Sequence, residues 1–467
     1  QIKKKTVIMK AFLSSLLFLL LATTGFCQAQ IEDFLNGQVS GENIFLEYDY
    51  TAMLDSIDAL NVELSSVDWG IYTQIRQSIL GEHPLDESGW SVAVSNDGQT
   101  LAIGGLKNDD AGTNSGHVRV YSWEESSADW QQMGLDINGL SVGDGCGRSV
   151  SLSADGTVLA VGANGNDSFA SNSGHTRVFN WDGSDWQQMG LDIYGELSGD
   201  YSGFSVSLAA DGASVAIGSP TNGTVTNGTA RVFGWDGDNL TWSQVGANIN
   251  GEDIGDQFGV SVSLSSDGSI LSVGASLNDG SGVDAGHVRI YELTNANAWT
   301  QLGGDIDGEL TDDRSGYSVS LSADGSKVAV GAVKNDDNGD RSGHVKVYQW
   351  NTTSEEWGQL GMSIPGEAAY DWSGWSVALS LDGNRLAISS SYNDDNGTNA
   401  GHVRVFSWDV DSGAWLQYGD DIDGEVSGDE SGWSVDLSAN GNVLVIGSPG
   451  NDDNGTDSGH VRIMVAN

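Results

Sequence analysis

A unit of 56 to 58 residues repeats seven times along the chain, and this period limits the fold more than any other feature. Most copies open with Ser-Gly-x-Ser-Val, and the glycine keeps one place in every copy: Gly89, Gly147, Gly203, Gly259, Gly316, Gly374 and Gly432. A fixed period of this length indicates one supersecondary unit repeated in space. The repeat therefore outweighs the total length, which alone suggests about three domains.

Each unit divides into four strand-like segments. In the fifth copy, residues 318–322 and 327–332 alternate polar and apolar side chains and flank a two-residue turn at 324–325. A third segment is predicted over residues 344–350, and a fourth over residues 357–364. Four antiparallel strands in each of seven copies predict an all-β protein, a seven-bladed β-propeller over residues 69–467.

The order of the segments predicts how the ring closes. A tryptophan opens each fourth segment: Trp69, Trp130, Trp186, Trp242, Trp299, Trp357 and Trp415. The first of these precedes the first complete copy, and the last copy stops after its third segment. We therefore expect residues 69–79 to pair with residues 460–465, so that one blade is built from both ends of the repeat region without free sheet edges.

The N-terminal 29 residues have the order of a secretory signal peptide. Three lysines at 3–5 precede an apolar run over residues 11–22, and cleavage is expected after Ala29. The run is too short for a comfortable membrane span, so we expect a secreted or cell-surface protein without a transmembrane segment in the mature chain. Residues 1–8 can lie upstream of the true start. Residues 30–68 are expected to form a leader, either flexible or with a short helix.

The two cysteines give little support for disulfides. Cys27 leaves a lipid-attachment signal open, although Phe26 is larger than the residue such signals place there. After signal cleavage only Cys146 remains, so no intramolecular disulfide is expected.

The net charge of −46 excludes nucleic acid as a reasonable partner, because such binding requires a basic surface. The charge is compatible with cations, with neutral ligands such as sugars, or simply with solubility. We expect a monomer.

Two families of acidic loops alternate along the chain. The first carries Gly-Glu-x-x-x-Asp before the repeat opening; its aspartates are Asp86, Asp144, Asp200, Asp256, Asp313, Asp371 and Asp429, and its glutamates are Glu82, Glu196, Glu252, Glu309, Glu367 and Glu425. The second carries Asn-Asp between the second and third segments in six copies. In an antiparallel blade both connections emerge on the same side, which we call the acidic face.

Oxygen-rich loops containing glycine are the kind of site that calcium prefers. The candidate ligands are Asp109, Asp110, Asp336, Asp337, Asp394, Asp395, Asp452 and Asp453. The alternative is structural, because Asp and Asn also cap turns by accepting bonds from their own backbone. One aspartate of each copy can also pair with the basic residue that every copy carries two places after the histidine position, as an ion pair that locks the blades.

Six of the seven histidines share one repeat position: His117, His175, His287, His344, His402 and His460. A common metal or catalytic centre would require them to converge, but a ring places them one blade apart. We therefore expect them to make structural hydrogen bonds.

The residue after the Ser-Gly opening varies and is often aromatic. Together with one nearby tryptophan, these positions supply the ligand-binding candidates Trp90, Phe204, Tyr317, Trp372, Trp375 and Trp433. They are expected on the acidic face near the central axis, where aromatic rings beside carboxylates suit a sugar. The alternative is packing between blades. We find no catalytic constellation that breaks the symmetry of the repeats.

The repeats resemble the FG-GAP propeller repeats of integrin α-subunits and related bacterial surface proteins. The similar motifs are Phe258-Gly259, Val273-Gly274-Ala275, and the Gly-Ser-Pro triplets at 218–220 and 447–449. The resemblance implies a propeller that binds ligands and calcium. In that family calcium often occupies an Asp-rich loop between the first two strands; here this loop is only Asp-Gly, so those sites cannot be transferred.

These features favour a binding or adhesion module that recognises a glycan or protein ligand on the acidic face. Two alternatives stay open: a polysaccharide-active lyase or hydrolase on the same scaffold, and a purely structural surface protein.

Overall fold

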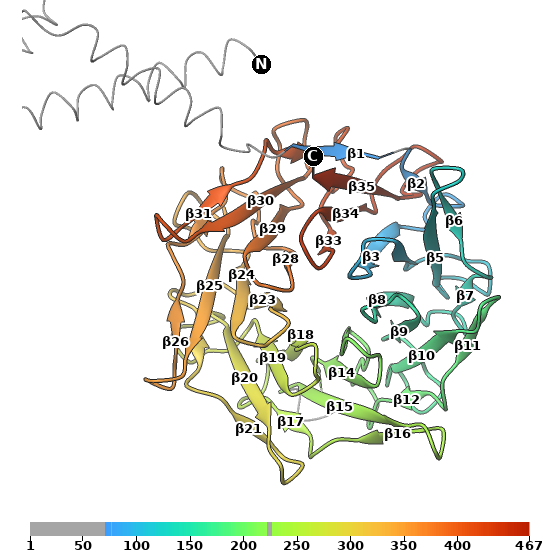
Figure 1. Cartoon of the computed structure of the whole chain (residues 1–467), viewed down its shortest axis with the longest axis horizontal. Coiled ribbons are helices and arrows are strands. Elements are labelled where there is room, and N and C mark those ends of the chain that lie inside the picture. Colours follow the sequence, from blue (N-terminus) through green and yellow to red (C-terminus); the bar gives the residue numbers. More distant parts are fainter. Residues whose placement is uncertain (1–70, 76, 222–226, 467) are drawn as a thin grey trace, which may run out of the picture. The chain divides into compact units, whose positions relative to one another are not determined.

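The computed structural model describes residues 71–466 except residue 76 and residues 222–226. The predictions of a signal peptide over 1–29 and a leader over 30–68 lie outside the described residues. All regular elements in the described part are strands, and they form seven antiparallel sheets arranged as a ring (Figure 1). The predicted seven-bladed β-propeller is therefore confirmed.

The blades are numbered in the order in which their innermost strands occur along the chain. Each innermost strand begins near the repeat glycine. Blade 1 contains β3 (Ser88–Val94), β4 (Thr100–Gly105), β5 (His117–Glu124), β6 (Asp129–Gln132) and β7 (Ile137–Asn138); blade 2 contains β8 (Cys146–Leu152), β9 (Val158–Ala163), β10 (His175–Trp181), β11 (Trp186–Gln188) and β12 (Ile193–Tyr194); blade 3 contains β13 (Ser205–Leu208), β14 (Ser214–Ser219), β15 (Thr229–Asp236), β16 (Thr241–Gln244) and β17 (Ile249–Asn250).

The remaining blades follow the same plan. Blade 4 contains β18 (Phe258–Leu264), β19 (Ile270–Ala275), β20 (His287–Leu293), β21 (Trp299–Gln301) and β22 (Ile306–Asp307); blade 5 contains β23 (Ser315–Leu321), β24 (Lys327–Ala332), β25 (His344–Asn351), β26 (Glu356–Gln359) and β27 (Ile364–Pro365); blade 6 contains β28 (Val377–Leu379), β29 (Arg385–Ser390), β30 (His402–Asp409), β31 (Ala414–Gln417) and β32 (Ile422–Asp423); blade 7 contains β33 (Ser434–Leu437), β34 (Val443–Ser448), β35 (His460–Ala466), β1 (Tyr72–Gln74) and β2 (Ile79–Leu80).

The fourth strand is interrupted, which differs from the single segment predicted over 357–364. In blade 5, β26 and β27 both pair with β25, and Gly361 lies between them with φ 78°. A Cβ atom on Gly361 would lie 2.8 Å from the Trp408 ring of the next blade. Glycine is therefore required there, because it permits both the left-handed backbone and the close approach of the next blade.

The ring closes as predicted, with the first described strands completing the last blade. β1 pairs antiparallel with β35 from Tyr72 opposite Ala466, and β2 pairs with the same strand from Leu80 opposite His460. The Tyr72 hydroxyl also donates to the carbonyl of Gly441 in the same blade. The outer edge of β35 is thereby covered by strands from the other end of the repeat region.

A closed circuit of backbone hydrogen bonds joins the hairpin turns between first and second strands. One residue of each turn donates to its counterpart in the next blade, through Asn96, Ala154, Ala210, Ser266, Ala323, Leu381 and Ala439, and the last donates back to Asn96. The seven N···O distances are 2.8 to 3.0 Å. This circuit gives one backbone donor of every blade a partner in the next blade, and it passes through all seven blades.

The Ser-Gly-x-Ser opening also joins neighbouring blades. Ser91 Oγ donates to the carbonyl of Gly147 at 2.8 Å, and Ser434 Oγ donates to Gly89 across the closure at 2.9 Å. Gly89 and Gly147 have φ near 90°, and a Cβ on Gly147 would lie 2.6 Å from the carbonyl oxygen of His117. Glycine is therefore required at this repeat position, both by the backbone conformation and by the close contact with the preceding blade.

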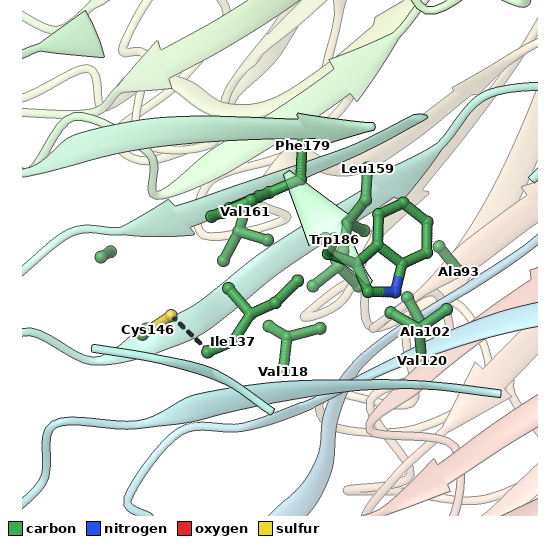
Figure 2. Close-up of a cluster of buried hydrophobic side chains, with 12 residues drawn as sticks. Ala93, Ala102, Val118, Val120, Ile137, Cys146, Leu159, Val161, Phe179 and Trp186 are labelled. Carbon is green, nitrogen blue, oxygen red and sulfur yellow. Dashed lines mark hydrogen bonds between the residues drawn. The ribbon is translucent and has the colours of Figure 1, made fainter. Parts of the chain in front are cut away.

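The hydrophobic core lies between the blades. Figure 2 shows one such cluster, in which Val118 and Ile137 of blade 1 pack with Leu159, Phe179 and Cys146 of blade 2. Cys146 is a free, fully buried thiol, and its Sγ lies 3.4 Å from the carbonyl oxygen of Ile137.

The fourth-strand tryptophans join neighbouring blades by hydrogen bonds. Trp357 Nε1 donates to Leu302 O of the preceding blade, and Trp415 Nε1 donates to Leu360 O, at 2.9 and 3.0 Å respectively. Each ring also packs against a cross-strand partner of its own blade, Trp350 or Trp408. The repeated tryptophan thus combines apolar packing with one interblade hydrogen bond.

Candidate functional site

Both acidic loop families lie on one face, because they hydrogen-bond to each other. We call the stretch between an outer strand and the next inner strand a crossing segment, and the connection between second and third strands an Asn-Asp loop. In the crossing segment at 81–87, Glu87 N donates to Asp457 O of the blade 7 loop at 3.0 Å. The same pairing recurs where Trp372 N donates to Arg341 O at 3.2 Å. The two loop families therefore lie side by side on the acidic face.

Most of the Asp and Asn residues that recur at the same position of each copy cap these turns. Asp429 Oδ2 accepts hydrogen bonds from Glu425 N and Val426 N at 3.1 and 3.0 Å. In the Asn-Asp loop of blade 7, Asn451 Oδ1 accepts from Asp453 N, and Asp452 Oδ1 accepts from Asp457 N. The capping alternative is confirmed for these side chains.

The basic residue of the repeat links two blades, and in several copies its acidic neighbour is the glutamate of the crossing segment and not the aspartate of that segment. Arg404 Nη2 donates to Pro365 O of the preceding blade at 2.7 Å, while its Nη1 lies 3.7 Å from Glu367 Oε1. Lys346 likewise pairs with Glu309. The expected pairing with Asp is therefore corrected, because the capping Asp already accepts backbone N–H groups.

The calcium candidates separate into two groups. Asp109, Asp336, Asp394 and Asp452 each direct Oδ1 to a backbone N–H of their own loop. Asp110, Asp337, Asp395 and Asp453 instead join a crossing-segment glutamate and the repeat histidine in clusters whose donor atoms lie within 4.8 Å of one another. Such donor sets are able to hold a metal ion. A fifth cluster, in blade 4, combines Glu252, His287 and Asp305.

The repeat histidines are buried, yet most do not make the structural hydrogen bonds expected from the sequence. Within the described residues, both ring nitrogens of His117, His175, His402 and His460 have no hydrogen-bond partner. Burial, and then the neighbouring arginine, lower the pKa of His402 to about 3 and that of His460 to about 4. The rings of His402 and His460 are therefore neutral at pH 7. His344 differs, because its Nδ1 lies 3.4 Å from Asp337 Oδ2.

The residues after the Ser-Gly openings meet around the axis of the ring. Trp433 contacts Trp90 and Trp375, with ring centroids 4.8 and 4.6 Å apart, and Trp375 contacts Tyr317 at 4.8 Å. On the other side, Arg148 stacks on Phe204 at 3.8 Å. Five of the six aromatic ligand candidates thus line the axis and pack partly on one another, while remaining partly exposed.

The sixth candidate, Trp372, extends this set towards the acidic face on one side only. It contacts Trp375 and Tyr392, with centroid distances of 5.8 and 5.3 Å, and Tyr392 also contacts Trp433. We call Trp372, Trp375, Tyr392 and Trp433 the axial aromatic cluster. It breaks the repeat symmetry that the sequence analysis considered intact, because no other Asn-Asp loop carries an aromatic residue at the position of Tyr392.

Trp372 occupies a repeat position with a left-handed backbone. Its φ is 55°, and the equivalent residues, Glu87, Gly145, Tyr201, Gln257, Arg314 and Glu430, have φ between 52° and 62°. Glycine adopts this conformation without strain, yet only one copy uses it. The other six copies carry a side chain at this position in spite of the strain, and these side chains differ in size and charge.

A carboxyl group with a shifted pKa lies beside the axial aromatic cluster. Burial, with repulsion from Glu87 and Asp457, raises the pKa of Glu430 to about 7. The Tyr392 pKa is raised as well, by burial and by the charge of Glu430. This part of the acidic face therefore combines aromatic rings with a carboxyl group that exchanges protons near neutral pH.

A groove of about 440 Å³ opens between blades 5 and 6. It is lined by Asn338, Pro365, Glu367, Arg404, Phe406 and Trp415, and it shares Glu367 with the blade 6 histidine cluster. No pattern within one copy of the repeat indicates this groove, since residues of two blades line it.

Comparison with known proteins supports the repeat assignment. The model of the FG-GAP repeat family matches residues 307–348, 365–406 and 422–463, which fall in the last three blades. No curated protein matches the chain. Among solved structures, the chain is similar to a candidate 6-phosphogluconolactonase from Bacteroides uniformis, at 13% identity and a TM-score of 0.52, over 76% of this chain and 90% of that chain. The predicted FG-GAP resemblance is thus confirmed, and the structural likeness concerns the fold alone.

In the part of the chain that the structure describes, no helix is long and apolar enough to cross a membrane.

Proposed function

We propose that this FG-GAP-like propeller repeat protein is a secreted or cell-surface binding module whose acidic face recognises a glycan at the axial aromatic cluster. The observation that carries the proposal is the one-sided grouping of Trp372, Tyr392 and Trp433 beside Glu430. A perfect repeat would not create such a differentiated patch, so its residues are better explained by a ligand than by ring assembly.

The chemistry of the patch suits a sugar. Partly exposed aromatic rings offer flat apolar surfaces for the C–H face of a pyranose, and nearby carboxyl groups accept hydrogen bonds from its hydroxyl groups. The net charge of −46 favours a neutral glycan over a polyanionic one.

A protein ligand is the second candidate, and a different observation favours it. The crossing segments carry exposed apolar side chains around the acidic face, including Leu85, Ile254, Leu310, Tyr370 and Val426, which are 52% to 74% exposed. Apolar groups distributed among acidic ones are common where a partner protein docks.

Glycan-array screening followed by calorimetry tests the proposal. We expect Trp372→Ala and Tyr392→Ala each to weaken glycan binding at least tenfold, because each removes a stacking surface. Tyr201→Ala is the matched control, since Tyr201 occupies the repeat position of Trp372 in another crossing segment and has the same backbone conformation. Equal losses in all three variants, or no loss at Trp372, would contradict the glycan site. Release of cleaved sugar in the same experiments would favour the enzymatic alternative.

A further inference from the structure

Three of the acidic clusters surround a buried imidazole that lacks a partner. The side chains of His117 and His402 are 0% exposed and that of His460 is 1% exposed. Within the described residues, Nδ1 of each ring makes no hydrogen bond. A buried polar atom without a partner is energetically unfavourable, so such an atom normally contacts a ligand, an ion or a water molecule.

Each of these Nδ1 atoms points at carboxylate oxygens. His117 Nδ1 lies 3.7 Å from Glu82 Oε2 and 3.6 Å from Asp136 Oδ2, and Asp110 completes this cluster. Such separations are too long for hydrogen bonds. They are close to the spacing of two atoms that each lie about 2.1 Å from a common cation, roughly 3.4 Å in tetrahedral geometry.

The other two clusters repeat this arrangement in blades 6 and 7. His402 Nδ1 lies 3.9 Å from Glu367 Oε2, and Asp395 is the third member. His460 Nδ1 lies 3.9 Å from Glu425 Oε2 and 3.7 Å from Asp453 Oδ2.

We propose that the clusters around His117, His402 and His460 bind divalent transition-metal ions, such as Zn²⁺ or Mn²⁺, through the imidazole Nδ1 and the facing carboxylates. The blade 1 site has four donors and is expected to bind most tightly. In each site the glutamate comes from a crossing segment and the other donors come from the blade that it enters. A bound ion therefore fastens successive blades together, and in blade 1 it fastens the segment that follows the closing strands.

The donor set distinguishes these sites from calcium sites. Calcium prefers six to eight oxygen ligands, whereas imidazole suits zinc and neighbouring transition metals. The turns between first and second strands also do not fit calcium, because Asp324 Oδ1 already accepts from Ser322 Oγ and Ser326 N.

The remaining blades lack the same combination, which makes them internal controls. Leu140 replaces the glutamate in blade 2, and Thr229 replaces the histidine in blade 3. In blade 4, Arg289 pairs with both Glu252 and Asp305. In blade 5, His344 is hydrogen-bonded and Lys346 pairs with the glutamate.

The test uses the full chain without a histidine tag, stripped of metal and then dialysed against micromolar Zn²⁺, Mn²⁺ or Ca²⁺. We expect about three equivalents of Zn²⁺ by elemental analysis and a higher melting midpoint, because ligands that bind only the folded state stabilise it. The triple variant Asp110→Asn, Asp395→Asn, Asp453→Asn is expected to lose at least tenfold in Zn²⁺ affinity.

The matched control is the triple variant Asp109→Asn, Asp394→Asn, Asp452→Asn, which changes the adjacent aspartates that cap the loops. Asparagine still accepts the backbone hydrogen bonds at these positions. Zn²⁺ binding is therefore expected to persist in this variant. The proposal is overturned if neither Zn²⁺ nor Mn²⁺ binds, since the orphan nitrogens would then face water. It is equally overturned if both triple variants bind alike, or if Ca²⁺ binds more tightly and only the control variant loses it.

Discussion

Asp436 shows how one residue can depart from the repeat at the closure of the ring. In blades 2 to 5 a serine at this position accepts a backbone bond from the next blade, as Ser151 Oγ does from Leu208 N at 3.0 Å. Asp436 Oδ2 takes this role at the junction of blades 7 and 1, where it accepts from Val94 N at 2.8 Å. Burial raises the pKa of Asp436 to about 6, against 3.8 ordinarily.

We predict that Asp436→Asn stabilises the protein at pH 8 by about 1–3 kcal/mol. The pKa of the folded state lies above that of the unfolded state, so the destabilisation by the carboxylate is absent below about pH 4, where both states are protonated. It builds up between about pH 4 and 6, where the unfolded chain is ionised and the folded one is not, and it is fully present above about pH 6. Urea unfolding should therefore show a difference that grows from pH 4 to pH 6 and then stays nearly constant to pH 8. A difference that is the same at all three pH values would argue against a titration effect.

Removing the carboxylate of Glu430 should also stabilise the protein, and this effect should develop at a higher pH because the pKa of Glu430 is about 7. We predict that Glu430→Gln raises the melting midpoint at pH 8.5 and has little effect at pH 5, since the carboxylate that is removed is charged only at the higher pH. Differential scanning calorimetry across this range measures the effect. Its neighbours Glu87 and Asp457 provide the repulsion, so an equal shift at both pH values would contradict this explanation.

The closing strands β1 and β2 are the elements on which the ring depends. Deleting residues 66–80 should expose the outer edge of β35 and also remove the Tyr72 contact with Tyr418. An unpaired edge of this kind promotes association between molecules. We expect aggregated protein with a lower melting midpoint, measured by light scattering and calorimetry. Monomeric protein with unchanged melting would show that the closure contributes little to stability.

Strand boundaries were predictable from alternation and turns, but the break in the fourth strand was not. The predicted second segment of the fifth copy coincides with β24 (Lys327–Ala332), because residues on both sides of the turn alternate clearly. Gly361 gave no comparable signal, since its conformation depends on Trp408 of the next blade. Contacts between copies decide such details, and a pattern within one copy does not contain them.

The ring itself was predictable, whereas the clusters on its face were only partly so. Seven equal periods determine the number of blades, and the position of Trp69 indicates the closure. Glu82 and His117 are 35 positions apart and meet only because a crossing segment lies over the blade that it enters. Tyr392 was missed, although an aromatic residue at a position that is otherwise Lys, Gly, Thr or Leu was a visible irregularity.

The whole molecule carries 65 acidic and 19 basic residues, and two acidic loop families share one face. Repulsion between these carboxylates opposes folding, and salt screens it over distances that shrink from about 30 Å at 0.01 M to about 3 Å at 1 M. We predict that the melting midpoint rises by several degrees when NaCl is raised across this range in the presence of a chelator. The chelator matters, because it separates screening from specific binding of divalent ions.

A melting midpoint that falls as NaCl is raised would also have a clear cause in this structure. Salt also weakens ion pairs, and Lys346 with Glu309 and Arg289 with Glu252 join crossing segments to blades. A midpoint that falls with NaCl would mean that these pairs outweigh the general repulsion. Lys346→Met separates the two effects, because it removes one pair and one positive charge. If repulsion dominates, this variant should gain more stability from added salt than the unmodified protein does.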